Sequence, residues 1–536
     1  MINQYDSTKG VGDFSSSVST PSRILSFFGR LNYNLMERYL LTVTFRADGS
    51  SKFAPSNRWG YFPAAALGWR MSEEAFLNDV DWLDNLKLRV SYGEVGNDGI
   101  NSSLWSQNWE ATSDKRYQGA VNGAFLPSYS LGADMANKDL KWETTITRNI
   151  GVDFGFFNSR LTGTIDAYWN TTKDLLMKTA IPGITGFTST YANVGQTSNK
   201  GIEFALQGVL VKTRDWNVTA GFNINFNRGK VDKLADNVTG LYGTEWATSS
   251  TFPKSDYVLK EGRPVGLVRG LTADGFYTTD DFTYENGVYT LKEGVADVSS
   301  AVFPNYHLHN GMNERPAGQL AYPGMAKFKD LNDDGIINDD DVDVIGDMTP
   351  VHTGGFNINA TYKNFDLGLY FNWSYGNEIY NVNKLAALYG YKEGAVYENK
   401  LSIVKDCYKI YDVVNGELVA LTTPEQLNAA NANAKLPLAY SENGYVSTLG
   451  IEDGSYLRLN TLTLGYTLPK SMLQKAGISN LRVYGSIYNV FTITGYSGID
   501  AEVSTSTSTK TYPQLGMDWG TYPRARSFVL GVNLSF

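Results

Sequence analysis

The sequence predicts an all-β protein, a transmembrane antiparallel β-barrel. Three observations predict it. Apolar and polar side chains alternate along many segments, short and long connections alternate between those segments, and the chain ends on a strand that stops at Phe536. Successive side chains of a strand point to opposite faces, so this alternation gathers the apolar side chains on one face. A barrel with a lipid-facing outside and a polar lumen requires that pattern.

The last nine residues show the alternation most clearly. Phe528, Leu530, Val532, Leu534 and Phe536 form one apolar face, and the residues between them are mostly small or polar. A final strand that ends on an aromatic residue is typical of bacterial outer-membrane barrels. On these residues alone, the last strand of a soluble β-sandwich stays an alternative.

The same signals predict about 13 strands, each bounded by turn residues. They are expected at residues 23–34, 38–48, 58–70, 85–95, 141–156, 160–171, 199–211, 215–227, 352–362, 365–376, 456–468, 480–490 and 526–536. Representative apolar faces are Leu41-Val43-Phe45, Leu161-Gly163-Ile165-Ala167-Trp169, Val218-Ala220-Phe222-Ile224-Phe226 and Phe365-Leu367-Leu369-Phe371-Trp373.

The connections between these strands alternate in length. Turns such as the one at residues 363–364 alternate with long loops, above all near 96–140, 228–351 and 377–455. One connection, 49–57, is no longer than the turn that follows it. Short periplasmic turns and long extracellular loops are typical of an outer-membrane barrel, whereas a sandwich has no reason to keep this order.

An odd number of strands has a further consequence. The first and last strands of an antiparallel set of 13 run in the same direction, so they would pair parallel on closure. Bacterial barrels are antiparallel and use even numbers. We therefore expect residues 1–536 to be the carboxy-terminal part of a larger barrel, with the plug and the amino-terminal domain absent. The missing signal peptide at the start of the chain favours the same interpretation.

Composition excludes several classes of protein. The net charge is -9, from 46 basic and 55 acidic residues, and no basic patch is interleaved with aromatic residues. Nucleic acid is therefore not expected as a partner. Cys407 is the single cysteine, which excludes an internal disulfide and a cysteine metal cluster. No run of about 18 apolar residues occurs, so no transmembrane helix is expected.

Several motifs carry a resemblance to a known family. Residues 46–53 read R-A-D-G-S-S-K-F, residues 57–63 read N-R-W-G-Y-F-P, and residues 68–74 read G-W-R-M-S-E-E. This run resembles the SusC/RagA-type TonB-linked outer-membrane proteins of Bacteroidetes. Further matching landmarks follow in the same order, at residues 86–93, 96–97, 140–145, 161–166, 193–195, 199–203 and 522–524.

The resemblance implies the carboxy-terminal portion of a barrel of about 22 strands. In that family the barrel imports glycan fragments or peptides, is capped by a SusD-like surface lipoprotein, and takes energy from the TonB complex through the amino-terminal portion. Its expected partners are therefore outer-membrane lipid, the lipoprotein, the TonB complex, and an oligosaccharide or peptide substrate.

Other functions stay open. One is a non-transporting outer-membrane receptor or adhesin barrel, and another is a truncated, inactive transporter fragment. A secreted carbohydrate-active enzyme would need paired carboxylates on strands that face a cleft. The acidic residues concentrate in loops and turns, so the sequence predicts no enzyme and no catalytic residues.

One acidic segment has the spacing of a calcium-binding loop. Oxygen ligands at positions 1, 3 and 5, a backbone carbonyl at position 7 and a carboxylate at position 12 suit the hard cation Ca²⁺. The corresponding residues are Asp330, Asn332, Asp334, Ile336 and Asp341. A structural Ca²⁺, or another divalent ion, would stiffen the long 228–351 loop, and a solvated acidic turn is the alternative.

Aromatic and histidine side chains complete the candidates. Trp105, Trp109, Tyr242 and Trp246 lie in the predicted loops, where flat aromatic faces would stack on a sugar substrate. Packing within the loops is the alternative for all four. His307 and His309 are expected to be an ordinary exposed pair rather than metal ligands.

Overall fold

The computed structural model describes most of the chain. The described residues are 2–5, 14–16, 22–77, 79–107, 109–112, 120–121, 124–125, 128–132, 134–235, 238–248, 251–303, 315–388, 401–439, 444–473, 477–505 and 515–536. The chain divides into two compact units. Unit 1 comprises residues 1–206 and 229–238, and unit 2 comprises residues 207–228 and 239–536.

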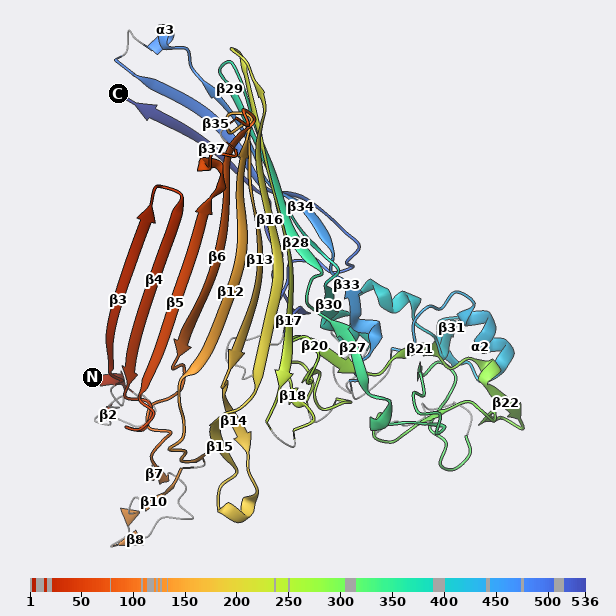
Figure 1. Ribbon diagram of the computed structural model, residues 1–536. Coiled ribbons are helices and arrows are strands. Elements are labelled where there is room, and N and C mark those ends of the chain that lie inside the picture. Colours follow the sequence, from red (N-terminus) through yellow and green to blue (C-terminus); the bar gives the residue numbers. More distant parts are fainter. Residues whose placement is uncertain are drawn as a thin grey trace. The chain divides into compact units, whose positions relative to one another are not determined.

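Thirteen long strands form one sheet in which every neighbour in space is also the next long strand in the chain (Figure 1). In order they are β3 (Ile24–Leu35), β4 (Tyr39–Ser50), β5 (Trp59–Arg70), β6 (Leu83–Asn97), β12 (Glu143–Phe156), β13 (Leu161–Lys173), β16 (Gln196–Lys212), β17 (Trp216–Lys233), β28 (His352–Tyr362), β29 (Phe365–Tyr375), β34 (Tyr456–Thr467), β35 (Asn480–Thr494) and β37 (Ser527–Ser535). The prediction of about 13 antiparallel strands is confirmed, and each predicted range overlaps one of them.

Tight turns set the register where two long strands follow each other closely. Between β3 and β4, Met36 and Glu37 both adopt left-handed backbone conformations, with φ of 55° and 59°. The amide of Arg38 donates to the carbonyl of Leu35 at 3.0 Å. Two successive left-handed residues make a type I′ turn, whose twist matches that of the strands it joins. With Arg38, these residues form a three-residue connection, and the β3–β4 ladder begins at the pair Leu35 and Tyr39.

Cross-strand register aligns the apolar side chains of unit 1 in rows. Leu41 of β4 lies opposite Leu67 of β5, which lies opposite Val90 of β6. Val90 in turn lies opposite Ile150 of β12, and Ile150 opposite Ala167 of β13. Because side chains directly opposite each other share a face, this row forms a continuous apolar surface. Leu67 is 59% exposed, as expected of a surface that meets lipid rather than a protein core.

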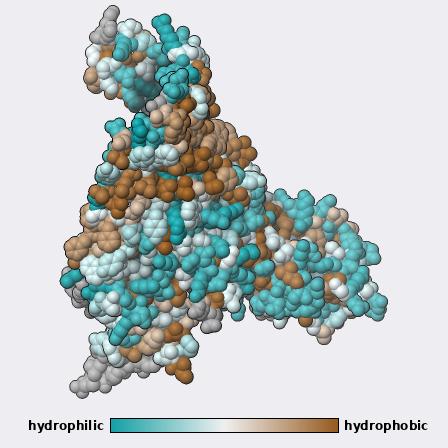
Figure 2. Space-filling model, in the orientation of Figure 1, coloured by the Kyte–Doolittle hydropathy of each residue, from teal (hydrophilic) through white to brown (hydrophobic). Residues whose placement is uncertain are grey.

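Unit 2 has the same kind of row. Ile358 of β28 lies opposite Leu369 of β29, Leu369 opposite Leu462 of β34, Leu462 opposite Ile487 of β35, and Ile487 opposite Phe528 of β37. The terminal strand thus contributes its apolar face to the surface that its neighbours form. In Figure 2, hydrophobic residues form a band over the upper part of the long strands, while hydrophilic residues prevail over the loop segments.

The opposite face of the sheet is polar, and glycines let ion pairs cross it. In unit 1, Arg89 of β6 contacts Asp166 of β13 at 3.0 Å across the intervening strand β12. A Cβ atom on Gly151 of β12 would lie 2.4 Å from the Asp166 carboxylate, so this position admits no side chain. In unit 2, Arg482 of β35 reaches Asp366 of β29 across β34.

Shorter elements occupy the loop segments. Unit 1 contains β1 (Ile2–Tyr5), β2 (Phe14–Ser16), β7 (Trp109–Thr112), β8 (Ala120–Val121), β9 (Ala124–Phe125), β10 (Ser128–Leu131), β11 (Asp134–Met135), β14 (Leu176–Ala180) and β15 (Ser189–Asn193). Unit 2 contains β18 (Leu241–Gly243), β19 (Tyr257–Leu259), β20 (Leu267–Gly270), β21 (Ala273–Phe276), β22 (Phe282–Glu285), β23 (Val288–Leu291), β24 (Asp297–Val298), β25 (Ala326–Phe328), β26 (Ile336–Ile337), β27 (Asp343–Asp347), β30 (Glu378–Asn381), β31 (Tyr411–Val414), β32 (Glu417–Ala420), β33 (Ile451–Asp453) and β36 (Met517–Asp518). Its helices are α1 (Val382–Leu388), α2 (Pro424–Asn431) and α3 (Lys470–Leu473).

The loop segments of unit 2 share a hydrophobic core of their own. Tyr277, Tyr289, Tyr322 and Tyr380 are fully buried there. A buried tyrosine hydroxyl usually finds a hydrogen-bond partner, and the Tyr289 hydroxyl donates to the carbonyl of Thr422 at 3.0 Å. These segments are therefore a packed body rather than extended loops. Among the described residues, no helix has the length and apolar character needed to cross a bilayer.

A charge on the apolar face tests the two-faced sheet. We predict that Leu369→Arg lowers the free energy of unfolding of the complete barrel in a bilayer by about 2–4 kcal/mol, because the guanidinium would face hydrocarbon. Tyr370→Arg, at the next position on the polar face, should cost much less. Chemical unfolding in lipid vesicles measures both, and equal losses would contradict the assignment of the faces.

Candidate functional site

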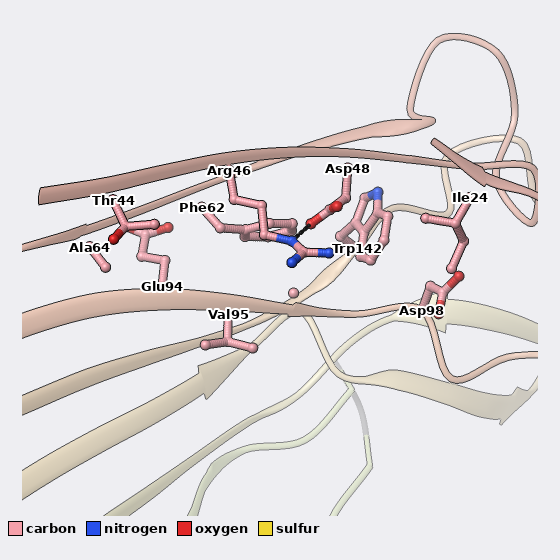
Figure 3. Close-up of a pocket in the computed structure, with 11 residues that line it drawn as sticks. Ile24, Thr44, Arg46, Asp48, Phe62, Ala64, Glu94, Val95, Asp98 and Trp142 are labelled. Carbon is pink, nitrogen blue, oxygen red and sulfur yellow. Dashed lines mark hydrogen bonds and ion pairs between the residues drawn. The ribbon is translucent and has the colours of Figure 1, made fainter. Parts of the chain in front are cut away.

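A cavity of about 510 Å³ opens between strands β4, β5 and β6 of unit 1 (Figure 3). Its lining combines charged, hydroxyl and aromatic side chains. The residues are Ile24, Thr44, Arg46, Asp48, Phe62, Ala64, Glu94, Val95, Gly96, Asp98 and Trp142. The volume lies within the range of small-molecule sites, and a mainly apolar lining with a few placed polar groups is typical of them.

Strand alternation brings the polar groups of β4 to this cavity. Thr44, Arg46 and Asp48 are every second residue, so they share one face of the strand. Phe45, which lies between Thr44 and Arg46, and Val43, which precedes Thr44, point to the apolar face and are exposed there. The charged part of the R-x-D motif thus lies on the polar side of the sheet.

An aromatic cluster closes one side of the cavity. The rings of Phe62 and Trp142 meet edge to face, with centroids 5.5 Å apart, and Phe53 packs on Trp142 at 5.6 Å. The Phe62 ring lies over Gly96, where an added Cβ atom would come within 2.0 Å of it. The indole nitrogen of Trp142 donates to the carbonyl of Arg58 at 2.9 Å, which fixes the ring plane.

An ion pair lies at the centre of the cavity. The Arg46 Nε atom donates to Asp48 Oδ2 at 2.6 Å, as the dashed line in Figure 3 marks. Asp48 is buried, and its Oδ1 atom has no hydrogen-bond partner among the described residues. The side chain of Arg46 is 52% exposed. The guanidinium therefore keeps donors available to a ligand.

Two further carboxylates, those of Glu94 and Asp98, line the cavity. Glu94 accepts from the hydroxyl of Tyr92 at 2.5 Å. Asp98 accepts from the hydroxyl of Ser50 at 2.7 Å and lies 3.7 Å from the Lys52 ammonium. The cavity therefore presents hydrogen-bond donors and acceptors side by side, which suits a polar ligand and requires no catalytic step.

The predicted aromatic residues lie elsewhere. Trp105 and Trp109 belong to unit 1 but do not line the cavity, and Trp109 is 67% exposed on β7. In unit 2, the Arg269 guanidinium lies over the ring of Tyr242 at 4.8 Å, and Trp246 packs against Tyr380 at 6.4 Å. Their stacking on sugars stays a prediction. His307 and His309 lie outside the described residues.

The acidic loop of unit 2 is held by its own backbone. Asp330 Oδ2 accepts from the amide of Gly335 at 2.7 Å, and Asp334 Oδ1 accepts from the amide of Ile336 at 2.8 Å. The side-chain amide of Asn332 donates to Asp334 Oδ2 at 3.0 Å. These contacts fold the segment into a compact turn.

Asp341 ends the same loop and is fully buried. Its two carboxylate oxygens accept from the amides of Leu331 at 2.7 Å and Asn338 at 2.8 Å, so it joins the two ends of the turn. In the part of the chain that the structure describes, no group of three or more His, Cys, Asp or Glu side chains is arranged to hold a metal ion. Calcium at this loop stays a prediction from the spacing of the residues.

Comparisons with known proteins identify the family. Residues 2–323 match the family model described as TonB dependent receptor-like, beta-barrel. TonB-dependent receptor SusC of Bacteroides thetaiotaomicron is 32% identical over 530 residues, which is 97% of this chain and 44% of that protein. TonB-dependent receptor P3 of Formosa agariphila is 31% identical over 530 residues, 97% of this chain and 46% of that protein.

The chain belongs to the TonB-dependent receptor family. The resemblance to SusC/RagA-type proteins is thereby confirmed, as is the location in the outer membrane as a β-barrel. The receptor chain spans about half the length of the curated relatives it matches. A solved structure of the RagAB peptide transporter superposes with a TM-score of 0.70 over 96% of this chain and 48% of that chain, at 24% identity, which shows the shared fold.

The cavity of the receptor was not predicted from the sequence. Arg46, Asp48 and Trp142 were landmarks of the resemblance to the family, with no binding role. One signal was available, because two charged residues at successive polar-face positions of β4 precede the aromatic N-x-W-G-Y-F-P run. Trp142 gave no such signal, since it is 84 residues from its partner Arg58.

The glycine beneath Phe62 tests the packing of the cavity wall. We predict that Gly96→Ala destabilises the receptor by about 1–3 kcal/mol, the usual cost of overpacking, because the new methyl group would displace the Phe62 ring. Gly485→Ala is the matched control, since its nearest atom beyond the strand, on Leu530, would be 3.5 Å away. Thermal unfolding in detergent measures both, and an unchanged midpoint for Gly96→Ala would refute the packing.

Calcium binding is tested by titration of the complete receptor with CaCl₂ after chelator treatment. The spacing predicts a higher melting temperature with calcium and no such rise in Asp334→Asn, which lacks the ligand at position 5. Asp343→Asn, just outside the loop, is the control. Identical melting curves with and without calcium would contradict calcium binding. The segment would then be an acidic turn whose carboxylates bond only amides of its own residues.

Proposed function

We propose that this chain is the carboxy-terminal barrel portion of an outer-membrane importer of nutrients, either glycan fragments or peptides. The observation that carries the proposal is the 97% coverage of the chain by SusC at 32% identity, over a sheet with one apolar and one polar face. The names of the relatives describe TonB-dependent receptors, and one matching structure is of a peptide transporter.

The chemistry of the polar face supports passage of a polar substrate. Cross-strand pairs such as Arg89 with Asp166 and Arg482 with Asp366 leave this face charged but locally balanced. The cavity at Arg46 and Asp48 adds to the same face one carboxylate oxygen, Asp48 Oδ1, that has no hydrogen-bond partner among the described residues. Because the charges on this face are paired, a neutral polar solute binds to it only weakly and is able to move along it.

Two partners belong to the proposal. A SusD-like surface lipoprotein would cap the end of the barrel that carries the long loops, whose packed core in unit 2 offers a rigid base. The TonB complex would act on the amino-terminal portion of the whole protein, which also supplies the plug. A barrel of about 22 strands has a lumen wide enough to need one.

Uptake by the complete receptor in cells tests the proposal. We predict that growth on the imported nutrient requires the receptor gene, the neighbouring lipoprotein gene and TonB, and that a protonophore stops accumulation of labelled substrate. A receptor that binds its ligand but supports the same uptake without TonB would overturn import and favour the non-transporting receptor or adhesin. Failure of the chain to reach the outer membrane in a folded form would favour an inactive fragment.

A further inference from the structure

A second cavity, of about 360 Å³, lies on the apolar face of unit 1. We propose that it binds one glycerophospholipid of the membrane, with an acyl chain in the cavity and the phosphate on Arg38. The inference concerns the outer wall of the barrel and is independent of what the receptor transports.

The position of the cavity indicates an apolar ligand. Most of its lining consists of side chains at alternate positions of β3 to β6, all on the face that the register assigns to lipid. They are Tyr33, Leu35, Tyr39, Leu41, Leu67, Trp69, Leu88 and Val90, and Leu40 and Gly68 complete the lining. The lining is almost wholly apolar, so water in it would lack the two to four polar partners that an ordered water needs. Hydrocarbon is what surrounds this face in the outer membrane, and an acyl chain fills such a hollow.

One end of the cavity carries polar groups. The Tyr39 hydroxyl and the Trp69 indole nitrogen both donate to Glu74 Oε1, at 2.7 Å and 3.0 Å. Glu74 lies in the connection between β5 and β6, just beyond the 3-10 turn Met71–Glu73. Tyrosine and tryptophan with an apolar body and a polar tip are typical of the boundary between hydrocarbon and headgroups. This end of the cavity is therefore at headgroup level.

A cation lies at the same end. Arg38 Nη1 contacts Glu74 Oε2 at 3.3 Å, and the Arg38 side chain is 37% exposed. Only one of its five donors is engaged by that contact, so the guanidinium retains donors for a phosphate. Hydrogen bonds from Tyr39 and Trp69 hold the pKa of Glu74 below its ordinary value. The ionised carboxylate therefore holds Arg38 next to Tyr39 and Trp69, two residues that line the cavity.

The geometry favours a phospholipid over a detergent-like or neutral lipid. An apolar hollow next to a cation at headgroup depth matches a molecule with both an acyl chain and a phosphate. The short turn that carries Arg38 belongs to the end of the sheet that short connections assign to the periplasm. The ligand is accordingly a phospholipid of the leaflet on that side.

Native mass spectrometry of the complete receptor, extracted in mild detergent from its own membrane, tests the proposal. We expect the wild type to retain one phospholipid through delipidation steps that remove all others. Leu67→Trp, which fills the cavity, should lose that lipid, while Leu464→Trp should keep it. Leu67 and Leu464 are matched controls for each other, since both lie on the apolar face and are 59% and 52% exposed.

The phosphate contact is tested separately. Arg38→Gln should reduce the retained lipid at least tenfold, whereas Arg214→Gln, in another short turn, should not change it. All four variants are checked for heat-modifiable migration to show that they fold. Equal lipid loss in Leu67→Trp and Leu464→Trp would mean that only annular lipid is present, and it would overturn the proposal. Full retention in Arg38→Gln would overturn it as well.

Discussion

The structure depends on one constraint, which is that backbone amides and carbonyls inside hydrocarbon must find partners within the protein. A sheet meets this constraint only through complete ladders between strands. The thirteen long strands pair in simple chain order, so each interior strand has a ladder on both sides. Among the described strands, β3 and β37 are the edges of the sheet with one ladder each, and an odd antiparallel set makes them run in the same direction. The chain spans about half the length of the curated relatives it matches.

Register, once set by the ladders, determines where every side chain points. A shift of one residue in any strand would exchange its faces. The apolar row through Leu369 and Phe528 and the polar-face pair of Asp366 with Arg482 are therefore two results of the same pairing. Glycine at position 465 belongs to the same arrangement, because a side chain there would collide with both members of that pair. The cavity lined by Leu67 and Val90 and the cavity lined by Arg46 and Asp48 lie on opposite faces of β3 to β6 for the same reason.

Much of the fold was predictable from the sequence because dyad alternation is a local signal. The predicted strand at residues 365–376 and the observed Phe365–Tyr375 differ by one residue. The end of β17 was less predictable, since the prediction stopped at residue 227 and the strand continues to Lys233. That extension lies beyond the apolar rows, where the pairing of strands, rather than contact with lipid, keeps the chain extended.

The site was not predictable to the same degree, because its contacts join distant parts of the chain. The Ser50 hydroxyl donates to Asp98 across 48 residues, and the Trp142 indole donates to the carbonyl of Arg58 across 84. Elsewhere on the polar face, Asp366 meets Arg482 across 116 residues. His352, at the start of β28, accepts at its Nδ1 atom from the Trp373 indole of β29 at 3.1 Å. Such contacts follow from the register of whole strands, which no single segment encodes. The packed core of the unit 2 loops was missed for the same reason.

A spin-label accessibility scan along β29 would test the two-faced sheet most directly. The complete receptor would carry one label at a time at residues 365–375, in a Cys407→Ala background, and be measured in bilayers with oxygen and with a water-soluble nickel complex. The account predicts a period of two residues. Labels at odd positions should be more accessible to oxygen, and labels at even positions more accessible to the nickel complex. Uniform accessibility, or a period that follows no alternation, would contradict it.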